Sequence, residues 1–420
     1  MFNKSLRLTT TLLISAALVF AVSASWPSPN TASAAQAMGR VAGEDRFDTA
    51  ARVSLSRFSS DGSATTAVIA SGRNYPDALS GVSLAFLADG PLLLTEPDYL
   101  PTVTHKELTR SVAYGSTVYV LGGEEAISSA VDADLIARGY TVQRVAGATR
   151  YGTSSNVAAE IDRLPGATPQ DHAFFVSGTS FADALAVSPL AAIQEEVILL
   201  SPHDALSTEV KAYLDATPSI TTATVIGGTD AIGDSVVDEL SARGLFTARI
   251  GGADRYDTAR LIADTFAAVP GAPEGVGLAS GENFPDALSA GAHLAGHGLP
   301  LLLTQKNNIG CVATADFLAQ YADRIHGGFV FGGLAVVSGR TDFYAEMLID
   351  GTATPGNCDT SDPASVAGSL GYDGIDKDCD DFASQNEADD YFVFDGGTVG
   401  NNVDGLDADG DGVACETHVY

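Results

Sequence analysis

Residues 40–50 read RVAGEDRFDTA, and this stretch decides the fold because it recurs twice further along the chain. Residues 144–154 read RVAGATRYGTS and residues 249–259 read RIGGADRYDTA, so the copies begin 104 and 105 residues apart. A period of this length matches one small domain and exceeds the roughly 20 to 50 residues of a solenoid unit. The sequence therefore predicts three tandem domains, each with its own core.

Three further motifs keep the same spacing. The first reads SGRNYPDAL from residue 71, SGTSFADAL from residue 177 and SGENFPDAL from residue 280. The second is a leucine-rich segment, PLLLT at 91–95, VILLS at 197–201 and PLLLT at 300–304. The third is a double glycine at 122–123, 227–228 and 332–333. Four ordered motifs in three copies indicate a triplication and exclude a chance likeness.

Strand-like and helix-like segments alternate within the first copy. Residues 66–70 and 117–121 are short runs rich in β-branched residues, and the segments 77–88 and 124–137 follow them with helical spacing. The continuous apolar run 91–94 is typical of a strand that is buried on both faces of its sheet. The pattern predicts α/β domains with parallel sheets.

Polar residues recur directly after the predicted strands. Because the carboxyl ends of parallel strands form the ligand crevice of an open sheet, we expect these residues to line a binding edge. The double glycines are expected to expose backbone N–H groups at a helix N-terminus, which favours anions. The candidates are Arg46, Arg150, Arg255, Asp77, Asp286, Thr95, Thr304, Gly122 and Gly123. The alternative is structural, since tight turns need glycine and the Arg and Asp positions suit an ion pair.

Together these motifs resemble the type 2 cell wall-binding repeats of Gram-positive surface proteins, over Arg40 to about Met347. The resemblance implies three Rossmann-like or Toprim-like domains in a pseudo-threefold arrangement, spanning residues 37–141, 142–246 and 247–348. It also implies non-covalent anchoring to an anionic secondary wall polymer, with the leucine-rich segments and their prolines Pro91 and Pro300 near the ligand. The second copy departs from the pattern, with Val197 and Ala182 in place of prolines.

The beginning of the chain predicts export. Lys4 and Arg7 precede an apolar run from about residue 12 to residue 22, and small-residue sites follow at 22–24 and 32–34. A membrane span needs about 20 apolar residues, so we interpret residues 1–34 as a signal peptide and a retained anchor as the alternative. We expect a secreted, wall-associated protein with no transmembrane segment. Its 53 acidic and 22 basic residues give a net charge of −31, which disfavours nucleic-acid binding.

An acidic linker, residues 349–372, leads to a calcium-loop pattern. Residues 407–416 read DADGDGVACE, with carboxylates at alternate positions and then the glycine of a sharp turn. Hard oxygen ligands at this spacing suit Ca²⁺ rather than zinc. The closing acid of an EF-hand is missing because His418 occupies its place, so Glu416 is the expected substitute. The predicted ligands are Asp407, Asp409, Asp411, the carbonyl of Val413 and Glu416, and the alternative is a solvated acidic turn without metal.

With Cys379 upstream, the tail over residues 373–420 resembles the Excalibur domain, a small extracellular calcium-binding module. The resemblance implies a disulfide between Cys379 and Cys415, which leaves Cys311 to pair with Cys358. Four cysteines allow three connectivities, so the pairing stays a prediction. The seven histidines share no repeat position, and His293 and His297 lack the glutamate and third ligand of a zinc protease.

These observations favour a non-catalytic wall-binding protein, a monomer with pseudo-trimeric repeats. Two other functions stay open. One is a metal-dependent enzyme acting on phosphoesters, with Asp77 or Asp286 holding a metal beside Arg46 or Arg255. The other is a calcium-dependent adhesion protein that uses the repeats only as its anchor.

Overall fold

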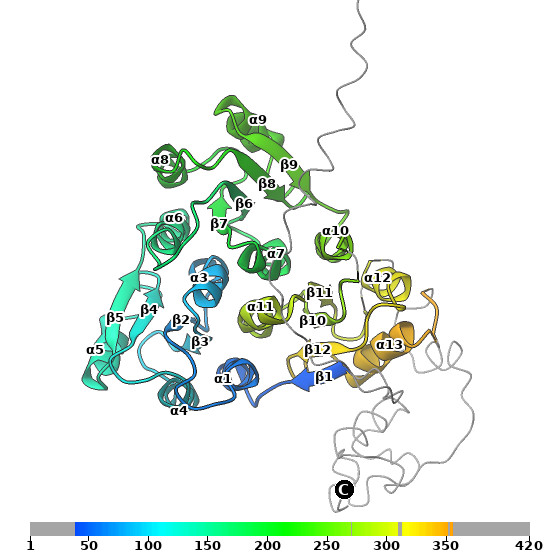
Figure 1. Ribbon diagram of the computed structural model, residues 1–420, viewed down its shortest axis with the longest axis horizontal. Coiled ribbons are helices and arrows are strands. Elements are labelled where there is room, and N and C mark those ends of the chain that lie inside the picture. Colours follow the sequence, from blue (N-terminus) through cyan, green and yellow to red (C-terminus); the bar gives the residue numbers. More distant parts are fainter. Residues whose placement is uncertain (1–37, 270, 310–312, 352, 356–420) are drawn as a thin grey trace, which may run out of the picture.

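Three four-stranded sheets surround a pseudo-threefold axis (Figure 1). The computed structural model describes residues 38–269, 271–309, 313–351 and 353–355 of the 420-residue chain. The predicted signal peptide, the four cysteines and the calcium loop lie outside the described residues. No helix of the described ranges is both long enough and apolar enough to cross a membrane.

All strands that pair within these sheets are parallel, which confirms the predicted α/β class. The first sheet has the order β3-β2-β4-β5 and contains β2 (Ala67–Ser71), β3 (Leu92–Thr95), β4 (Thr117–Leu121) and β5 (Thr141–Val145). The second has the order β7-β6-β8-β9 and contains β6 (His172–Ser177), β7 (Val197–Ser201), β8 (Thr222–Ile226) and β9 (Phe246–Ile250). The third has the order β11-β10-β12-β1 and contains β1 (Met38–Val41), β10 (Val276–Ser280), β11 (Leu301–Thr304) and β12 (Gly328–Phe331).

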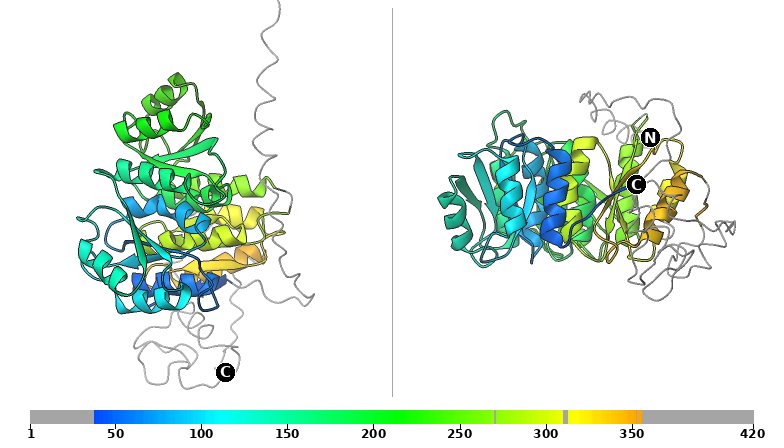
Figure 2. Two further views of the ribbon diagram at one scale, coloured as in Figure 1. Left: turned by 60° about the vertical axis from the view of Figure 1, so that its left-hand side comes forward. Right: turned by 90° about the horizontal axis from the view of Figure 1, so that it is seen from below.

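Helices cover the sheets and fill the centre of the molecule. Those of the first copy are α1 (Arg46–Arg57), α2 (Pro76–Leu79), α3 (Gly81–Leu87), α4 (Thr102–Ser111) and α5 (Ser129–Ala137). Those of the second are α6 (Arg150–Ile161), α7 (Ala182–Ile193), α8 (Thr208–Ala216) and α9 (Asp234–Ala242). Those of the third are α10 (Arg255–Ala267), α11 (Pro285–His297), α12 (Thr314–Gln320) and α13 (Gly339–Ile349). The side views in Figure 2 show the helices of the first copy standing alongside its strands.

The helices α3, α7 and α11 pack against one another at the centre of the ring (Figure 1). A central helix has neighbours on all sides, so it must be apolar all round, and each of the three contributes fully buried leucines such as Leu84, Leu185 and Leu288. Small residues allow the close approach. A Cβ atom on Gly291 would collide with the hydroxyl of Ser188 on α7. The centre of the ring therefore specifies both helix order and helix spacing.

Each sheet takes its last strand from the next sequence repeat. The strand β5, which opens the second repeat, pairs with β4 from Thr117 opposite Thr141 to Leu121 opposite Val145. Likewise β9 pairs with β8, and β1 closes the ring by pairing with β12 at the far end of the described chain. The largest hydrophobic cluster also contains residues from all three repeats. The expectation that each copy has its own core therefore holds only in part. One smaller cluster of buried residues lies within the first copy and another lies in the third copy together with Met38, whereas the sheets and central helices bury their apolar faces across repeat boundaries.

The element predictions hold for the strands and fail in part for the helices. The predicted strand 117–121 coincides with β4, and 66–70 differs from β2 by one residue. The predicted helix 77–88 is divided at Ser80 into α2 and α3. The predicted helix 124–137 begins only at Ser129, because the preceding residues form a turn in which the N–H of Ala126 donates to the carbonyl of Gly123 at 2.9 Å.

Candidate functional site

Three equivalent Ser-Gly turns follow β2, β6 and β10 at the carboxyl ends of the sheets. In the first, the Ser71 hydroxyl oxygen accepts a hydrogen bond from the N–H of Arg73 at 3.2 Å. Ser177 and Ser280 hold the N–H groups two residues further on in the same way, at 3.2 and 3.1 Å. A serine that bonds the backbone two residues ahead fixes a tight turn. The turns are therefore rigid features that the triplicated SGxx motif encodes.

The predicted arginines hold these turns from one side. The Nη1 atom of Arg46 donates to the carbonyl of Gly72 at 2.6 Å. Arg150 donates in the same way to Gly178, and Arg255 to Gly281. Each bond uses one N–H of a guanidinium group that carries five, so the contact orients the side chain at the edge of the sheet. The structure thus places the three arginines at equivalent positions.

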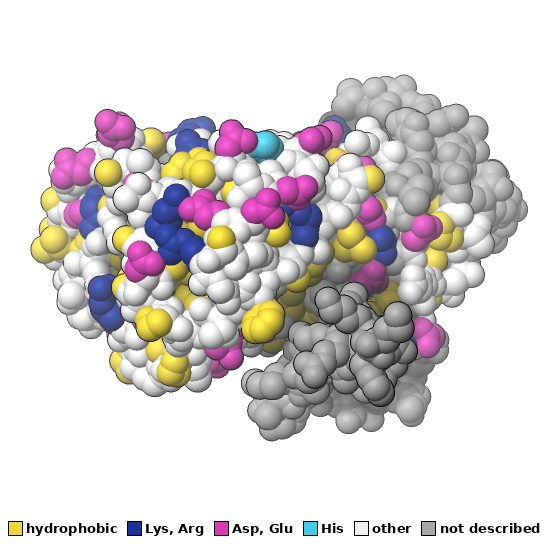
Figure 3. Space-filling view, turned by 90° about the horizontal axis from the view of Figure 1, so that it is seen from above, with side chains coloured by type: hydrophobic (Ala, Val, Ile, Leu, Met, Phe, Trp, Pro, Cys, Tyr) yellow, Lys and Arg dark blue, Asp and Glu magenta, His cyan; other side chains and the backbone are white. Residues whose placement is uncertain are grey.

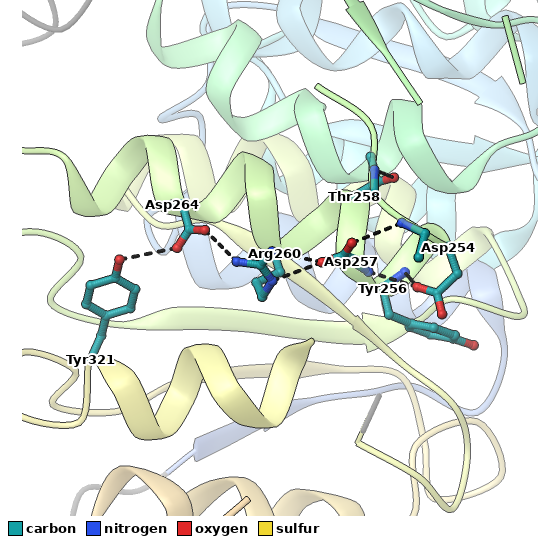
Figure 4. Close-up of polar contacts among 9 residues, drawn as sticks. Asp254, Tyr256, Asp257, Thr258, Arg260, Asp264 and Tyr321 are labelled. Carbon is teal, nitrogen blue, oxygen red and sulfur yellow. Dashed lines mark hydrogen bonds and ion pairs between the residues drawn. The ribbon is translucent and has the colours of Figure 1, made fainter. Parts of the chain in front are cut away.

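Helix capping determines where each arginine begins its helix. In the third copy the Asp254 carboxylate accepts from the N–H groups of Tyr256 and Asp257, both at 2.9 Å (Figure 4). Further along α10, Arg260 links Asp257 to Asp264 (Figure 4). Asp45 caps α1 in the same way, and the hydroxyl of Thr149 caps α6. A capping acid or hydroxyl satisfies N–H groups that the first helical turn leaves unpaired, so the arginine is the first residue of each helix.

The aromatic residue after each arginine explains the glycine of the turn. A Cβ atom on Gly72 would lie 2.5 Å from the Phe47 ring, and one on Gly178 would lie 2.5 Å from the Tyr151 ring. Such contacts are too close for any side chain. The Arg-aromatic and Ser-Gly motifs are therefore two halves of one packing arrangement.

The predicted acids lie in the first turn of α2, α7 and α11, beside the double glycines. The Asp77 carboxylate approaches Gly122 so closely that a Cβ on that glycine would lie 2.6 Å from Oδ2. The same contact joins Asp183 to Gly227 and Asp286 to Gly332. This proximity and the positive φ of +102° at Gly122 both exclude a side chain at the first glycine.

Arginine and aspartate meet across repeat boundaries. Burial raises the pKa of Asp183 to about 6, and the positive charge of Arg255 in the third repeat opposes this shift. Burial also raises the pKa of Asp286, against a hydrogen bond from Thr49 and the charge of Arg46 in the first repeat. The arginine of one copy therefore faces the acid of the preceding copy around the ring.

The double glycines do not begin a helix, contrary to the sequence prediction. The N–H of Gly122 donates to the carbonyl of Val145 at 2.9 Å, and the carbonyl of Gly122 accepts from Nη1 of Arg144 at 2.7 Å. Gly123 is followed by the turn before α5. Both backbone groups of Gly122 are thus used within the fold, so its predicted role as an anion-binding N–H is wrong.

In the first and third leucine-rich segments, the proline at the beginning and the threonine at the end lie at opposite ends of one strand, β3 or β11. The Thr95 hydroxyl is buried and donates to the carbonyl of Tyr99 at 2.9 Å, and Thr304 is also fully buried. Pro91 and Pro300 directly precede β3 and β11, so they lie at the amino ends of the strands, whereas the arginines lie at the carboxyl ends. The structure does not bring these prolines together with the other predicted site residues.

The arginine that opens each repeat was not among the residues predicted for the site. Arg144 donates to the carbonyl of Gly122 and binds the Asp132 carboxylate at 2.8 Å. Arg249 and Arg40 make the equivalent bonds to the carbonyls of Gly227 and Gly332. Arg40 also binds Asp342, the equivalent of Asp132, whereas Val237 occupies this position in the second copy and Arg249 binds the exposed Asp234 instead. These arginines fasten each exchanged strand to the preceding repeat. Their recurrence in step with the double glycines was the available signal.

Charges are interspersed on the molecular surface that Figure 3 displays. Basic side chains lie beside acidic ones on this face, with no continuous basic area among the described residues that it shows (Figure 3). A ligand with negative charge must therefore use local contacts, because the protein as a whole repels it.

The fold and the site define a class of repeat protein in which three α/β domains share one ring and present equivalent strand-end sites. The family model of cell wall binding domain 2 matches residues 40–132, 144–237 and 249–342, so the chain belongs to this family. The model of the Excalibur calcium-binding domain matches residues 376–416. Both resemblances seen in the sequence are thus confirmed, and the protein is cell wall-associated.

Two curated relatives from Bacillus subtilis (strain 168) are similar to this chain in sequence. The N-acetylmuramoyl-L-alanine amidase LytC is 30% identical over 279 residues, which are 66% of this chain and 52% of the amidase. The amidase enhancer is 30% identical over 224 residues, 53% of this chain and 29% of that protein. The chain thus matches about half of one relative and less than a third of the other.

Two solved structures share the fold. Cwp6 from Clostridium difficile has a TM-score of 0.66 at 22% identity, over 79% of this chain and 51% of that chain. Cwp8 from Clostridium difficile has a TM-score of 0.66 at 23% identity, over 74% of this chain and 52% of that chain.

Proposed function

We propose that this protein is exported and holds an anionic secondary polymer of the Gram-positive cell wall without chemical turnover. One observation carries the proposal. Each of the three sheets around the axis has one arginine at the carboxyl ends of its strands, where open α/β sheets bind their ligands. These arginines are Arg46, Arg150 and Arg255. Membership of the cell wall binding domain 2 family supports the same ligand class.

Short-range contacts must overcome long-range repulsion. The net charge of −31 disfavours the approach of a polyanion, although salt screens charges over about 8 Å at physiological ionic strength. Guanidinium groups form two parallel hydrogen bonds to phosphate or carboxylate, and these charge-assisted bonds are stronger than neutral ones. Binding should therefore strengthen when moderate salt screens the repulsion.

A matched pair of triple variants tests the arginines. Arg46→Gln, Arg150→Gln and Arg255→Gln together should reduce retention on purified walls. The control changes Arg138, Arg163 and Arg243 to glutamine, because these arginines lie at or just after helix C-terminal ends, away from the strand-end turns. Both triple variants change the net charge equally. Equal retention of the two proteins, with folding verified by circular dichroism, would refute the role of the strand-end arginines.

The absence of catalysis is tested on the same walls. The relative LytC is named as an amidase, so release of amino groups from walls is the first assay, and hydrolysis of phosphodiesters with added divalent metal is the second. Turnover in either assay that the purified protein sustains would overturn the non-catalytic proposal. Loss of that turnover in Asp77→Asn would assign it to the alternative phosphoester site.

We further propose that the tail binds Ca²⁺ through Asp407, Asp409, Asp411, the Val413 carbonyl and Glu416. These oxygen donors fit a hard cation, and they lie within the stretch that the Excalibur model matches. Disulfides between Cys379 and Cys415 and between Cys311 and Cys358 are part of this proposal. If the tail instead mediates calcium-dependent adhesion, deletion of residues 350–420 should abolish adhesion and leave wall retention intact.

A further inference from the structure

Three aromatic rings meet on the pseudo-threefold axis. Tyr75, Phe181 and Phe284 each precede the first residue of α2, α7 or α11, and they occupy the same position of the triplicated SGxx motif. The centroid of the Tyr75 ring lies 5.5 Å from the centroid of the Phe181 ring and 5.5 Å from that of the Phe284 ring, and the centroids of the two phenylalanine rings are 6.1 Å apart. Equivalent residues of a threefold ring that touch one another must surround its axis. We call them the axial aromatic triad.

The triad is accessible and fixed. All three rings are half-buried, so part of each ring faces solvent. The Tyr75 hydroxyl donates to the carbonyl of Thr179 in the second repeat at 2.9 Å. The rigid serine turns directly precede the triad in all three copies. The hydroxyl bond of Tyr75, the turns before the three residues and the contacts among the rings all restrain the triad, so binding should lose less conformational entropy than it would with free side chains.

A neutral polar residue precedes each aromatic residue of the triad in the chain. Asn74, Ser180 and Asn283 directly precede the three aromatic residues, and both asparagines are exposed. Amide and hydroxyl groups donate and accept hydrogen bonds without charge. The guanidinium carbon of Arg255 lies 5.7 Å from the centre of the Phe181 ring, at the margin of the triad. The axis therefore presents an apolar aromatic surface, and both neutral polar residues and the charged Arg255 are available nearby for hydrogen bonding.

We propose that the axial aromatic triad binds one pyranose ring of a saccharide, once per molecule. The apolar C–H face of a sugar packs on aromatic rings while its hydroxyls bond to neighbouring polar groups. The three rings, with centroids 5.5, 5.5 and 6.1 Å apart and planes tilted by 68°, 60° and 56°, form an apolar surface wider than one pyranose ring. A stacked nucleic-acid base is disfavoured by the net charge of −31. This inference rests on the proposed wall function and specifies a sugar unit of the polymer, recognised separately from its negative charges.

Paired double variants test the proposal. Phe181→Leu with Phe284→Leu removes two aromatic faces and keeps apolar side chains. The control, Tyr114→Leu with Phe246→Leu, removes two aromatic rings that are 68% and 76% exposed and lie before β4 and at the start of β9, at the opposite edge.

Saturation-transfer NMR on the full chain uses methyl glucoside, methyl galactoside and methyl N-acetylglucosaminide as probes. We expect transfer to the ring C–H protons of at least one glycoside with wild type and control, and its loss in the Phe181/Phe284 variant. Wall affinity of that variant should fall about tenfold. If wild type binds walls but no glycoside responds, or if the variant responds like wild type, the saccharide site is refuted and the wall function stands. If the wild-type protein does not bind walls, the proposed function is refuted, and the saccharide inference, which rests on it, is refuted with it. Should the double variant unfold, Phe284→Leu alone replaces it.

Discussion

Acid should destabilise this protein through one buried histidine. His293 lies on α11 and is only 1% exposed, and neither ring nitrogen has a hydrogen-bond partner among the described residues. Its ring packs edge-on against Phe329 of β12 at 4.7 Å and lies 4.7 Å from the ring of His297. Burial first, and then the positive charges of His297 and Arg57, lower the pKa of His293 to about 3. The folded protein therefore holds this imidazole neutral.

The size of the effect follows from the difference between folded and unfolded pKa. An unfolded histidine titrates near pH 6.5, so above that pH the group contributes no pH dependence. Below it the unfolded state binds the proton and the folded state does not, so stability falls by about 1.4 kcal/mol per pH unit until the folded pKa is reached. From pH 7 to pH 5 the loss is about 2 kcal/mol.

Replacing the histidine isolates this contribution. His293→Leu should unfold in denaturant at pH 7 with at least wild-type stability, because it removes two buried polar atoms that have no partner. Between pH 7 and pH 5 the variant should lose about 2 kcal/mol less than wild type. His326→Leu is the control, since His326 is exposed. Titrating groups that do not interact with His293 cancel in the comparison, and His297→Leu measured in the same way separates the contribution of its neighbour. Identical pH dependence of wild type and His293→Leu would refute the reasoning.

Three further predictions concern ring closure, the double glycine and the metal. Arg40→Gln should lower the free energy of unfolding by about 3 kcal/mol, because a half-buried guanidinium loses hydrogen bonds to two carbonyls and a carboxylate. The exposed Arg52→Gln should change it little, and equal denaturation midpoints for the two variants would contradict this. Gly122→Ala should lower the free energy of unfolding by about 2 kcal/mol, because φ at this residue is +102° and a Cβ atom would meet the Asp77 carboxylate. In the Gly123→Ala control the Cβ atom enters open space, so this variant should keep the wild-type denaturation midpoint. Asp409→Asn should abolish the heat of Ca²⁺ binding in calorimetry and any Ca²⁺-dependent rise in melting temperature, and a wild-type titration without heat would remove the predicted site.

The sequence predicted the three-domain α/β class because the triplicated motifs and continuous apolar strands are local patterns. It did not predict strand exchange. The residues of β1, β5 and β9 read as the start of a repeat, and only pairing partners far away in the chain reveal that each strand completes the preceding sheet. Long-range register leaves no trace in periodicity, so the sequence did not predict the hydrophobic cluster that all three repeats share.

The candidate site was predicted in part. Arg46 and its equivalents, and the acids after the Ser-Gly turns, occupy the sheet edge that topology assigned to them. The glycines were assigned to anion binding, but their conformation and their contacts with Asp77 and Arg144 explain them better. Tyr75 and its equivalents were overlooked, because an aromatic residue beside a helix start looks like ordinary core until the threefold arrangement brings three such rings together.

Strand exchange explains why the repeats work as a set. A chain with one or two repeats would leave a sheet without its edge strand and an arginine such as Arg144 without its glycine carbonyl. It would also leave a central helix with an apolar face in water, at a cost of about 25 cal/mol for each Å² exposed. Three copies close the ring because β1 returns to β12. The axial aromatic triad exists only in this closed state, so saccharide binding at the axis would report that the ring is complete.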